Sequence, residues 1–389
     1  MVPAMKKLNK YSLKLRDFNI SDLRKIRELL ESHYQKEYAR KRVEIFSWIS
    51  TKNPFSQTAP TYILLENDQQ IIAHLGRMPR IFRINGKNVK AYYTHDTLVH
   101  PEWRHGYGIY LNNEMIRELE KATDTFFLAM WMNQFTYMFL KRRGYYELDF
   151  YEYKKLLKPK FFLERKLKNR FLTRLIAPFA KYFIAAYDFL VYLPYFSTDL
   201  SVSKTPRFDS RFDKLFDKVL SRFRIIGERK AAYLNWRYVD KPFADHTVLT
   251  LKRGNDLVGY IVLQIIEEKA YKVGIINDLL TDPEVSSHIG TLIYAALSYF
   301  RKEGVNAVIC FLTDSRFIKI FRRFFFIRES LPIPVLISNL RKLKWPEFLT
   351  EATNWFLTFG DSDGYLWEIS GTSIPRGPEN VTFHVNPIR

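Results

Sequence analysis

The chain has 389 residues, of which 47% are apolar and 26% are charged. These values are typical of a globular protein, so they exclude a disordered chain and predict about two or three domains. The net charge of +20 is unusual and favours anionic partners, which are nucleic acid, phosphate-bearing cofactors, acidic proteins or acidic lipids. The only cysteine, Cys310, excludes a disulfide framework and a cysteine-based zinc site. The histidines show no metal-ligand spacing, so no metal is expected.

Helix and strand patterns alternate through the first part of the chain. Leu23, Ile26 and Leu29 recur at helical spacing. Asn85-Gly86 is typical of a hairpin turn, because both residues tolerate a positive φ. After the first helix, the predicted elements are strands at residues 61–66, 70–78 and 90–99, a helix at 107–121, a strand at 126–131, a helix at 135–143 and a strand at 147–153. This order predicts a mixed α/β fold.

The same order of patterns returns about 180 residues later. Trp48 and Trp236 are each followed six residues later by Pro-Phe, and Asp96 and Asp278 are each followed five residues later by Pro-Glu. Ordered matches of this kind predict an internal duplication. The predicted division is a first domain at residues 1–155, a helical linker at 156–209 and a second domain at 210–389.

The linker begins in a basic stretch and continues into an aromatic one. Residues 141–174 contain 12 Lys and Arg against four Asp and Glu. Arg174, Lys181 and Asp188 are seven residues apart, which predicts one polar stripe on an otherwise apolar helix. These charges and two prolines argue against a membrane-spanning helix. Three roles stay open for residues 154–196: a connection between the domains, a helix lying in a membrane surface, or a docking site for a partner such as an acyl carrier protein.

The N-terminus has no apolar signal segment. A cytoplasmic location is therefore expected, at the inner face of the membrane if the linker helix lies on lipid.

A short basic loop with two glycines follows the strand that ends at Val99. Residues 99–108 read Val-His-Pro-Glu-Trp-Arg-His-Gly-Tyr-Gly, and a helix is predicted to begin there. The glycines let a ligand approach the backbone, and the first turn of a helix leaves amide N–H groups unpaired. Together with the side chains of Arg104 and His105, these amides predict a phosphate site.

This segment resembles the phosphate loop of the GNAT acyltransferase superfamily. Asn133 after a strand and Gly144 after a helix resemble the next two segments of that pattern. The resemblance covers most of residues 12–153 and, more weakly, 210–339, which implies two tandem GNAT-like domains. The loop residues that match are Val99, Pro101, Glu102, Trp103, Arg104, Gly106 and Gly108, with Arg104 displaced by one position from the usual form.

The resemblance implies that acetyl-CoA or another acyl-CoA binds the first domain. It also implies direct transfer of the acyl group to an amine of a small molecule, such as an amino sugar or an amino acid. The implied contacts are the amides of Arg104, His105, Gly106, Tyr107 and Gly108 for the pyrophosphate, the backbone of Leu98 and Val99 for the pantetheine arm, and Asn133 for the thioester end.

Such a transfer needs a base for the ammonium proton and an acid for the leaving thiolate. Strand alternation places Thr94 and Asp96 on one face, so Asp96 is the first candidate for the base. His95, expected on the opposite face, is the second. Leu140 stands where the family usually has a tyrosine that acts as the acid. Tyr137, one turn earlier, is the candidate to take over this role.

The second domain lacks the phosphate loop, because residues 282–290 contain one glycine and no Lys or Arg. It is expected to supply half of the acceptor cleft. Near the end, Trp355, Asp361, Asp363 and Trp367 form a polar and aromatic group suited to a cationic acceptor. The sequence Gly-Asp-Ser-Asp-Gly within it more often forms a surface turn.

Two alternatives to this function stay open. A long-chain N-acyltransferase would use an acyl carrier protein or work at the membrane surface, with aromatic residues lining the acyl tunnel. A nucleic-acid-binding protein would use the charge of +20, but the sequence has no zinc-finger, helix-turn-helix or RNP-like motif.

Overall fold

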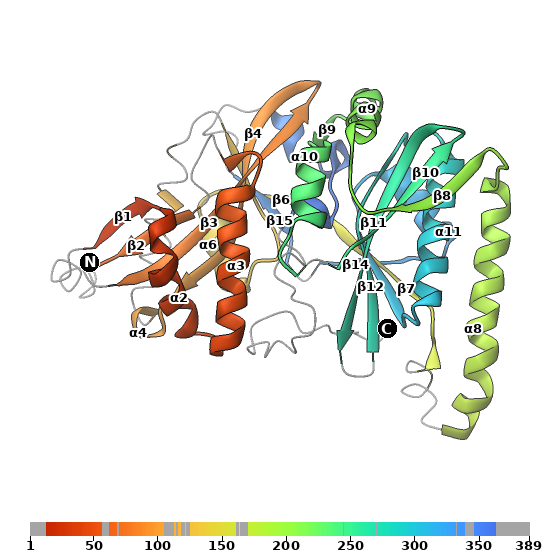
Figure 1. The fold of residues 1–389 in the computed structure, drawn as a ribbon, viewed down its shortest axis with the longest axis horizontal. Coiled ribbons are helices and arrows are strands. Elements are labelled where there is room, and N and C mark those ends of the chain that lie inside the picture. The colour runs from red at the N-terminus through yellow and green to blue at the C-terminus, as the bar shows by residue number, and fades with distance from the viewer. Residues whose placement is uncertain are drawn as a thin grey trace.

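Two mixed β-sheets stand side by side in the computed structural model, with helices packed on their faces (Figure 1). The described residues are 13–56, 62–67, 70–104, 113, 116–117, 121, 125–160, 163, 170–243, 245–268, 271–331, 333–338 and 346–362. The main helices are α2 (Leu23–Glu31), α3 (Lys36–Lys52), α4 (Pro101–Arg104), α6 (Gln134–Arg142), α8 (Arg170–Tyr192), α9 (Ser210–Val219), α10 (Ala231–Leu234), α11 (Ser286–Lys302) and α12 (Ser315–Arg323).

The first sheet has the strand order β1-β2-β3-β4-β5-β15-β6. Two short strands extend it, since β9 (Ile225–Gly227) pairs with β3 and β16 (Trp355–Phe356) pairs with β9. The other strands are β1 (Lys14–Asp17), β2 (Tyr62–Glu66), β3 (Ile71–Ile84), β4 (Lys87–Val99), β5 (Phe126–Ala129), β15 (Val335–Ile337) and β6 (Tyr146–Leu148).

The second sheet, taken in the same direction, has the order β8-β10-β11-β12-β13-β7-β14. In both orders every neighbouring pair is antiparallel except one, which is β4 with β5 in the first sheet and β12 with β13 in the second. The internal duplication stays a prediction, and this shared order supports it. The strands are β8 (Leu200–Thr205), β10 (Thr247–Arg253), β11 (Asp256–Glu268), β12 (Tyr271–Thr281), β13 (Ala307–Phe311), β7 (Tyr151–Leu156) and β14 (Ile327–Ser330).

The two sheets exchange one strand each. β7 comes from the first half of the chain but pairs with β13 and β14 of the second sheet. β15 comes from the second half but pairs with β5 and β6 of the first. The prediction of a single last strand at residues 147–153 is therefore wrong, because a period-two pattern does not identify the neighbour of a strand. The predicted domain boundary at residue 155 falls inside β7, and any division into domains has to include this exchange.

Local signals correspond well to the structure. Asn85 and Gly86 have φ values of 49° and 80° between β3 and β4, and Gly144 has a φ of 82° after α6. Helix α3 was absent from the predicted elements. Its buried face includes Arg42 at a position where an apolar residue would complete the helical pattern, which hides the periodicity.

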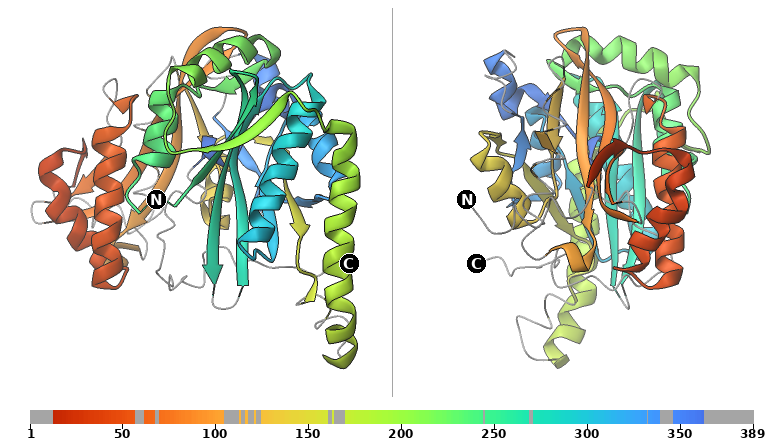
Figure 2. Two further views of the ribbon diagram at one scale, coloured as in Figure 1. Left: turned by 45° about the vertical axis from the view of Figure 1, so that its right-hand side comes forward. Right: turned by 90° about the vertical axis from the view of Figure 1, so that its left-hand side faces the viewer.

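Hydrophobic packing joins the two halves. One cluster of buried side chains runs from α2 and α3 through the first sheet into the second half, and a smaller cluster lies between the first sheet and α6. Trp48 on α3 stacks on Trp236, with ring centroids 4.5 Å apart and an angle of 11° between the planes. Figure 2 shows α3 and the second sheet from two further directions. The tryptophans that matched in the sequence thus meet where the halves touch.

Candidate functional site

β4 and β5 run together for four residues and then separate. Residues 91–94 pair with residues 126–129, while β4 continues for five residues to Val99. Among the described strands, none pairs with this edge of β4 beyond Thr94. Two backbone features lie at the separation, a φ of 46° at Asp96 and a φ of 53° at Trp131. A positive φ costs a residue with a side chain about 1–2 kcal/mol, so the surrounding structure has to hold Asp96 and Trp131 in this conformation.

A small pocket lies beside the separation, on the face of the sheet that α6 covers. Thr94 and Thr97 of β4 contribute polar side chains, and Leu75 comes from β3. The remaining lining residues are Ile116, Thr136, Phe139, Leu140 and Tyr145. The pocket thus adjoins the part of β4 that the GNAT resemblance assigns to the pantetheine arm.

Asp96 and His95 face the opposite side of the sheet, toward α3. Arg42 of α3 forms an ion pair with Asp96, and the Nδ1 atom of His74 lies 3.7 Å from the Asp96 Oδ2 atom. The His95 ring contacts the edge of Tyr62, with centroids 5.3 Å apart. All of these side chains are buried. The first sheet therefore encloses a compact group of one guanidinium, one carboxylate and two imidazoles.

The predicted alternation of Thr94, His95 and Asp96 is wrong at Asp96. Thr94 lines the pocket on the α6 side, whereas Asp96 lies with His95 on the α3 side. The reason is a β-bulge, because His74 is opposite Leu98 while Gly76 is opposite His95, which leaves one extra residue on β4. The positive φ of Asp96 turns its side chain to the face of its neighbour.

Burial governs the charge states of this group. Burial lowers the pKa of His74 and of His95 to about 4 in each case, so both imidazoles are neutral at pH 7. Burial alone would raise the pKa of the Asp96 carboxyl, but Arg42 and the two imidazoles outweigh it and the net shift is downward. Asp96 is thus a carboxylate held by an arginine, with a neutral imidazole beside it.

The other expected catalytic residue, Tyr137, lies across the sheet from His95 and Asp96. It is on α6, and its hydroxyl donates a 2.5 Å hydrogen bond to Glu147, which raises the pKa of the phenol. Tyr137 is not among the residues that line the pocket. Asn133 caps the same helix, accepting a 2.8 Å hydrogen bond from the Thr136 amide. The structure therefore gives Tyr137 and Asn133 local partners and does not bring Tyr137 together with His95 or Asp96.

The start of the predicted phosphate loop is described, and the rest is not. Arg104 ends α4 and donates a 3.1 Å hydrogen bond from Nε to the Val99 carbonyl. The Nε2 atom of His33 lies 3.0 Å from the same oxygen. Leu98 is buried against the α3 side of the sheet. His105, Gly106, Tyr107 and Gly108 lie outside the described residues.

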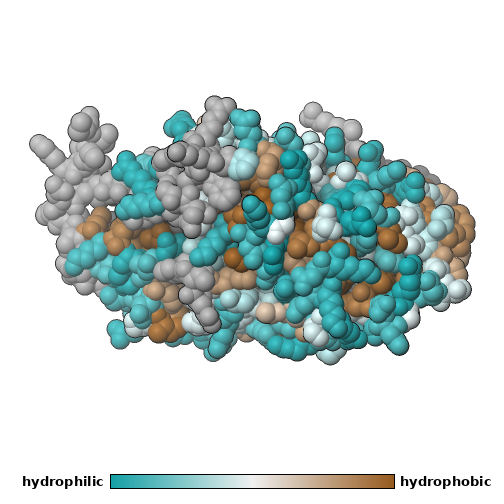
Figure 3. Space-filling model, turned by 90° about the horizontal axis from the view of Figure 1, so that it is seen from above, coloured by the Kyte–Doolittle hydropathy of each residue, from teal (hydrophilic) through white to brown (hydrophobic). Residues whose placement is uncertain are grey.

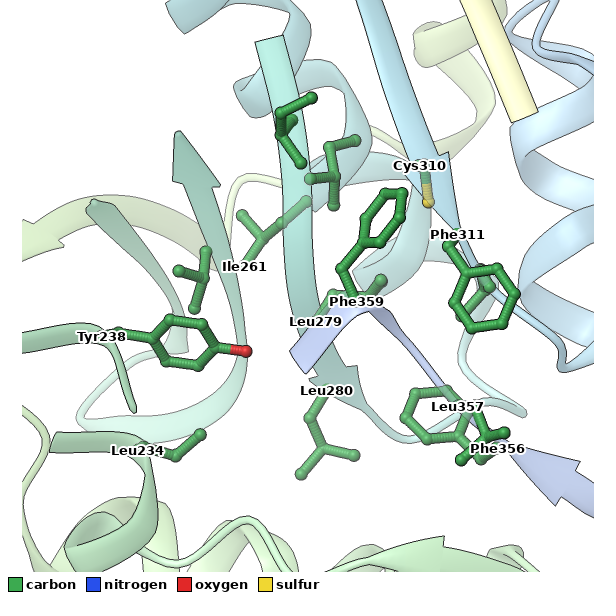
Figure 4. Packing of buried hydrophobic residues seen from close by; sticks show 14 of the residues in the cluster. Leu234, Tyr238, Ile261, Leu279, Leu280, Cys310, Phe311, Phe356, Leu357 and Phe359 are labelled. Atoms are coloured by element: carbon green, nitrogen blue, oxygen red, sulfur yellow. The ribbon is translucent and has the colours of Figure 1, made fainter. Parts of the chain in front are cut away.

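In the second sheet, β12 and β13 also separate, but other residues fill the space beside them. β12 pairs with β13 over residues 273–276 and then continues for five residues to Thr281. Residues 355–362 occupy the region beside the end of β12. Thr358 forms an isolated β-bridge with Leu312. The rings of Phe359 and Phe311 pack with their centroids 5.7 Å apart (Figure 4). The alternative of a surface turn for this segment is wrong, because Asp361 and Ser362 are buried. Asp363 and Trp367 lie outside the described residues.

Buried charges fix this filling segment. Arg229 lies 3.1 Å from Asp278 and also pairs with Asp361. Arg80 of the first sheet lies 2.7 Å from the same Asp361 carboxylate, and Thr358 donates a 2.9 Å hydrogen bond to Asp278. Sequence reasoning missed both arginines, since their partners are 281 and 132 residues away along the chain. Asp278, which matches Asp96 in the repeat, thus has a structural partner of its own.

The segment also reaches the first site. Ser362 accepts a 2.9 Å hydrogen bond from the Trp131 indole, immediately beyond β5. The second half therefore contacts the place where β5 leaves β4. Among the described residues, no group of His, Cys, Asp and Glu side chains is arranged to hold a metal ion.

Solved structures share the fold of this chain. A crystal structure of a probable N-acyltransferase from Enterococcus faecalis is similar over 84% of this chain and 72% of its own, with a TM-score of 0.55 and 10% identity. A GCN5-related N-acetyltransferase from Anabaena variabilis matches over 84% and 72%, with a TM-score of 0.53 and 11% identity. The chain has the GNAT fold.

An N-acyltransferase structure of similar size is also among these matches. Saccharomyces cerevisiae N-myristoyltransferase with bound myristoyl-CoA is similar over 84% of this chain and 83% of its own, with a TM-score of 0.52 and 13% identity. No protein-family model and no curated protein matches the sequence. The GNAT fold expected from the phosphate loop is thus confirmed, and at these identities the likeness concerns the fold alone.

Proposed function

We propose that this GNAT-fold protein is an acyl-CoA-dependent N-acyltransferase whose first half binds the donor. The observation that carries the proposal is the separation of β4 from β5, with a pocket lined by Thr94 and Thr97 beside it. The loop with Gly106 and Gly108 follows directly after this strand in the sequence. The pantetheine arm would pair with β4 before Val99, because the Val99 carbonyl already accepts a hydrogen bond from Arg104.

In the proposed reaction, the amine loses a proton and attacks the thioester carbonyl, and coenzyme A leaves as a thiolate. We assign the proton to His95, which takes it through a water molecule because its side chain is buried on the α3 side of the sheet. His95 is neutral at pH 7 because burial lowers its pKa to about 4, and the nearby Asp96 carboxylate opposes only part of this shift. Water would protonate the thiolate, since Tyr137 would first have to leave Glu147.

The acceptor is proposed to be a small amine such as an amino sugar or an amino acid. The contact of Ser362 with Trp131 supports the place of the acceptor cleft. It brings the second half to the end of β5, where that half is expected to form one side of the cleft.

The test is release of coenzyme A from acetyl-CoA in the presence of amino sugars, amino acids, peptides and polyamines. We expect turnover with at least one amine. We expect His95→Gln to lower kcat by about 100-fold with little change in the KM for the donor, whereas Tyr137→Phe stays within about threefold of wild type. Absence of both turnover and calorimetric binding of coenzyme A would contradict the proposed function. A normal kcat in His95→Gln would contradict only the assignment of the base.

A second candidate is transfer of a long acyl chain. It is favoured by the similarity to N-myristoyltransferase with bound myristoyl-CoA and by the apolar residues Ile116, Phe139 and Leu140 in the pocket. The same assay with acetyl, C8, C12 and C16 donors separates the candidates. A higher kcat/KM for C12 or C16 than for acetyl supports the long-chain reaction, and the reverse order contradicts it.

A further inference from the structure

Helix α8 lies at the edge of the molecule, and its first half extends beyond the second sheet (Figures 1 and 2). Its second half is attached to the protein. The Asp188 carboxylate lies 2.9 Å from Lys155 and also pairs with Arg301, and Tyr192 stacks on Tyr294 with ring centroids 4.2 Å apart. These contacts fix the direction in which the first half of the helix points.

The outer face of α8 is apolar and exposed. Leu175, Phe179 and Phe183 follow one another at four-residue spacing, so they form a single stripe, which Leu190 continues. Their exposed fractions are 56%, 72%, 71% and 60%. Phe325 next to the helix is also exposed. We call these five residues the apolar face of α8. Figure 3 shows hydrophobic surface at the end of the molecule where α8 lies.

Such a surface needs an explanation, because monomeric soluble proteins seldom expose contiguous apolar patches of this kind. Charge indicates what covers it. Residues 158–181 contain eight Lys and Arg and one Glu, a net charge of +7 at and just before the exposed half of α8. Arg174 and Lys181 share the stripe of Asp188, on the other side of the helix from the apolar face. Aromatic residues on one face and basic residues on the other are typical of helices that lie in anionic membrane interfaces.

We propose that the apolar face of α8 docks the protein on the surface of an anionic lipid bilayer. A second copy of the chain fits less well, because a symmetric contact through this face would bring two segments of charge +7 together. An acidic carrier protein would match the charge but has no need of a long aromatic stripe.

The helix lies in the interface and does not cross the bilayer. Residues Arg174–Tyr195 are long and apolar enough to cross a membrane by length and composition. Crossing would pull Asp188 away from Lys155 and Arg301 and leave the buried Lys155 ammonium without its carboxylate. Such a loss costs several times more free energy than an exposed ion pair contributes.

The experiment is co-sedimentation of the full-length protein with vesicles of phosphatidylcholine, alone or with about 30% phosphatidylglycerol, at about 0.15 M salt. We expect binding to the anionic vesicles and at least tenfold weaker binding to the neutral ones. We expect the double variant Phe179→Ser with Phe183→Ser to reduce binding to anionic vesicles by at least tenfold. Ile20→Ser, which changes an apolar residue of 53% exposure far along the chain, is the matched control and should bind like wild type.

Equal thermal melting of the three proteins shows that the substitutions leave the fold intact. Equal binding of the double variant and wild type would overturn the proposal, as would the absence of binding to either vesicle. If the wild type forms a dimer in lipid-free buffer and the double variant does not, the surface binds a second copy of the chain and the proposal is overturned. Capture by an acyl carrier protein without vesicle binding would assign it to a carrier. Release of the bound protein by alkaline carbonate supports docking in the interface, and resistance to it would contradict that orientation.

Discussion

The two sheets separate at the same place but use the space differently. In the first, residues 95–99 of β4 extend beyond the last contact with β5, and a pocket lies beside them. In the second, residues 277–281 of β12 extend equally far beyond β13, and Phe359 and its neighbours fill the region. The comparison teaches that a shared strand order does not imply a shared ligand. The first half leaves a pocket that suits the proposed donor, whereas residues 355–362 fill the equivalent space in the second half.

The largest effect is expected from filling the pocket of the first half. Thr97→Trp places an indole beside β4, and Thr97 is exposed enough for the substitution to leave the fold intact. We expect affinity for coenzyme A to fall by about 100-fold or more, which corresponds to about 3 kcal/mol. Isothermal titration calorimetry measures it. Ser201→Trp on the exposed β8 of the second sheet is the control and should bind normally. Equal affinity in both variants would mean that the donor does not use this pocket.

Stability should depend most on the carboxylate that fixes the filling segment of the second half. Asp361→Ala leaves Arg80 and Arg229 buried without this partner. We expect a loss of about 3–5 kcal/mol in the free energy of unfolding, measured by urea denaturation. The exposed pair of Arg207 and Asp240 supplies the control, since Asp240→Ala should cost less than about 1 kcal/mol. Similar losses in the two variants would contradict the structural role assigned to the segment.

A smaller effect concerns the imidazoles that the first half places near Asp96. The pKa of His74 in the folded protein is about 4, below its ordinary value of 6.5. Between pH 4 and pH 6.5 the unfolded chain therefore binds a proton at His74 that the folded protein does not bind. Stability is therefore complete above pH 6.5 and falls as the pH drops toward 4. We expect the loss between pH 7 and pH 5 to be about 1–2 kcal/mol smaller in His74→Gln than in wild type. Parallel curves for the two proteins would show that His74 is not buried in the neutral form.

Features encoded within a few residues were predictable, and those encoded by distant partners were not. The turn at Asn85-Gly86 and the end of α6 before Gly144 follow from residues that tolerate positive φ. The fold followed from the loop after Val99 and the order of elements around it. The face on which Asp96 lies did not follow, because a bulge next to Gly76 interrupts the alternation.

Close packing around the bulge explains why Gly76 is needed there. A Cβ atom at Gly76 would lie 2.6 Å from the His95 ring, so the ring can occupy this position only because residue 76 has no side chain. Burial of Asp361 was equally hidden, since the sequence around it resembles a surface turn and its two arginines are far away along the chain. The strand that ends at Val99 was therefore predicted from sequence, the site beside it stays a prediction, and the ion pair of Arg42 with Asp96 required the structure.

The exchange of β7 and β15 has a consequence for synthesis on the ribosome. The gap between β5 and β6 can be closed only by β15, which leaves the ribosome almost 190 residues after β6. Until then the growing chain holds an unfinished sheet whose two inner edges expose backbone N–H and C=O groups that promote aggregation. The first sheet can thus be completed only after most of the second half has been synthesised, and neither half is a self-sufficient unit for truncation, fusion or expression on its own.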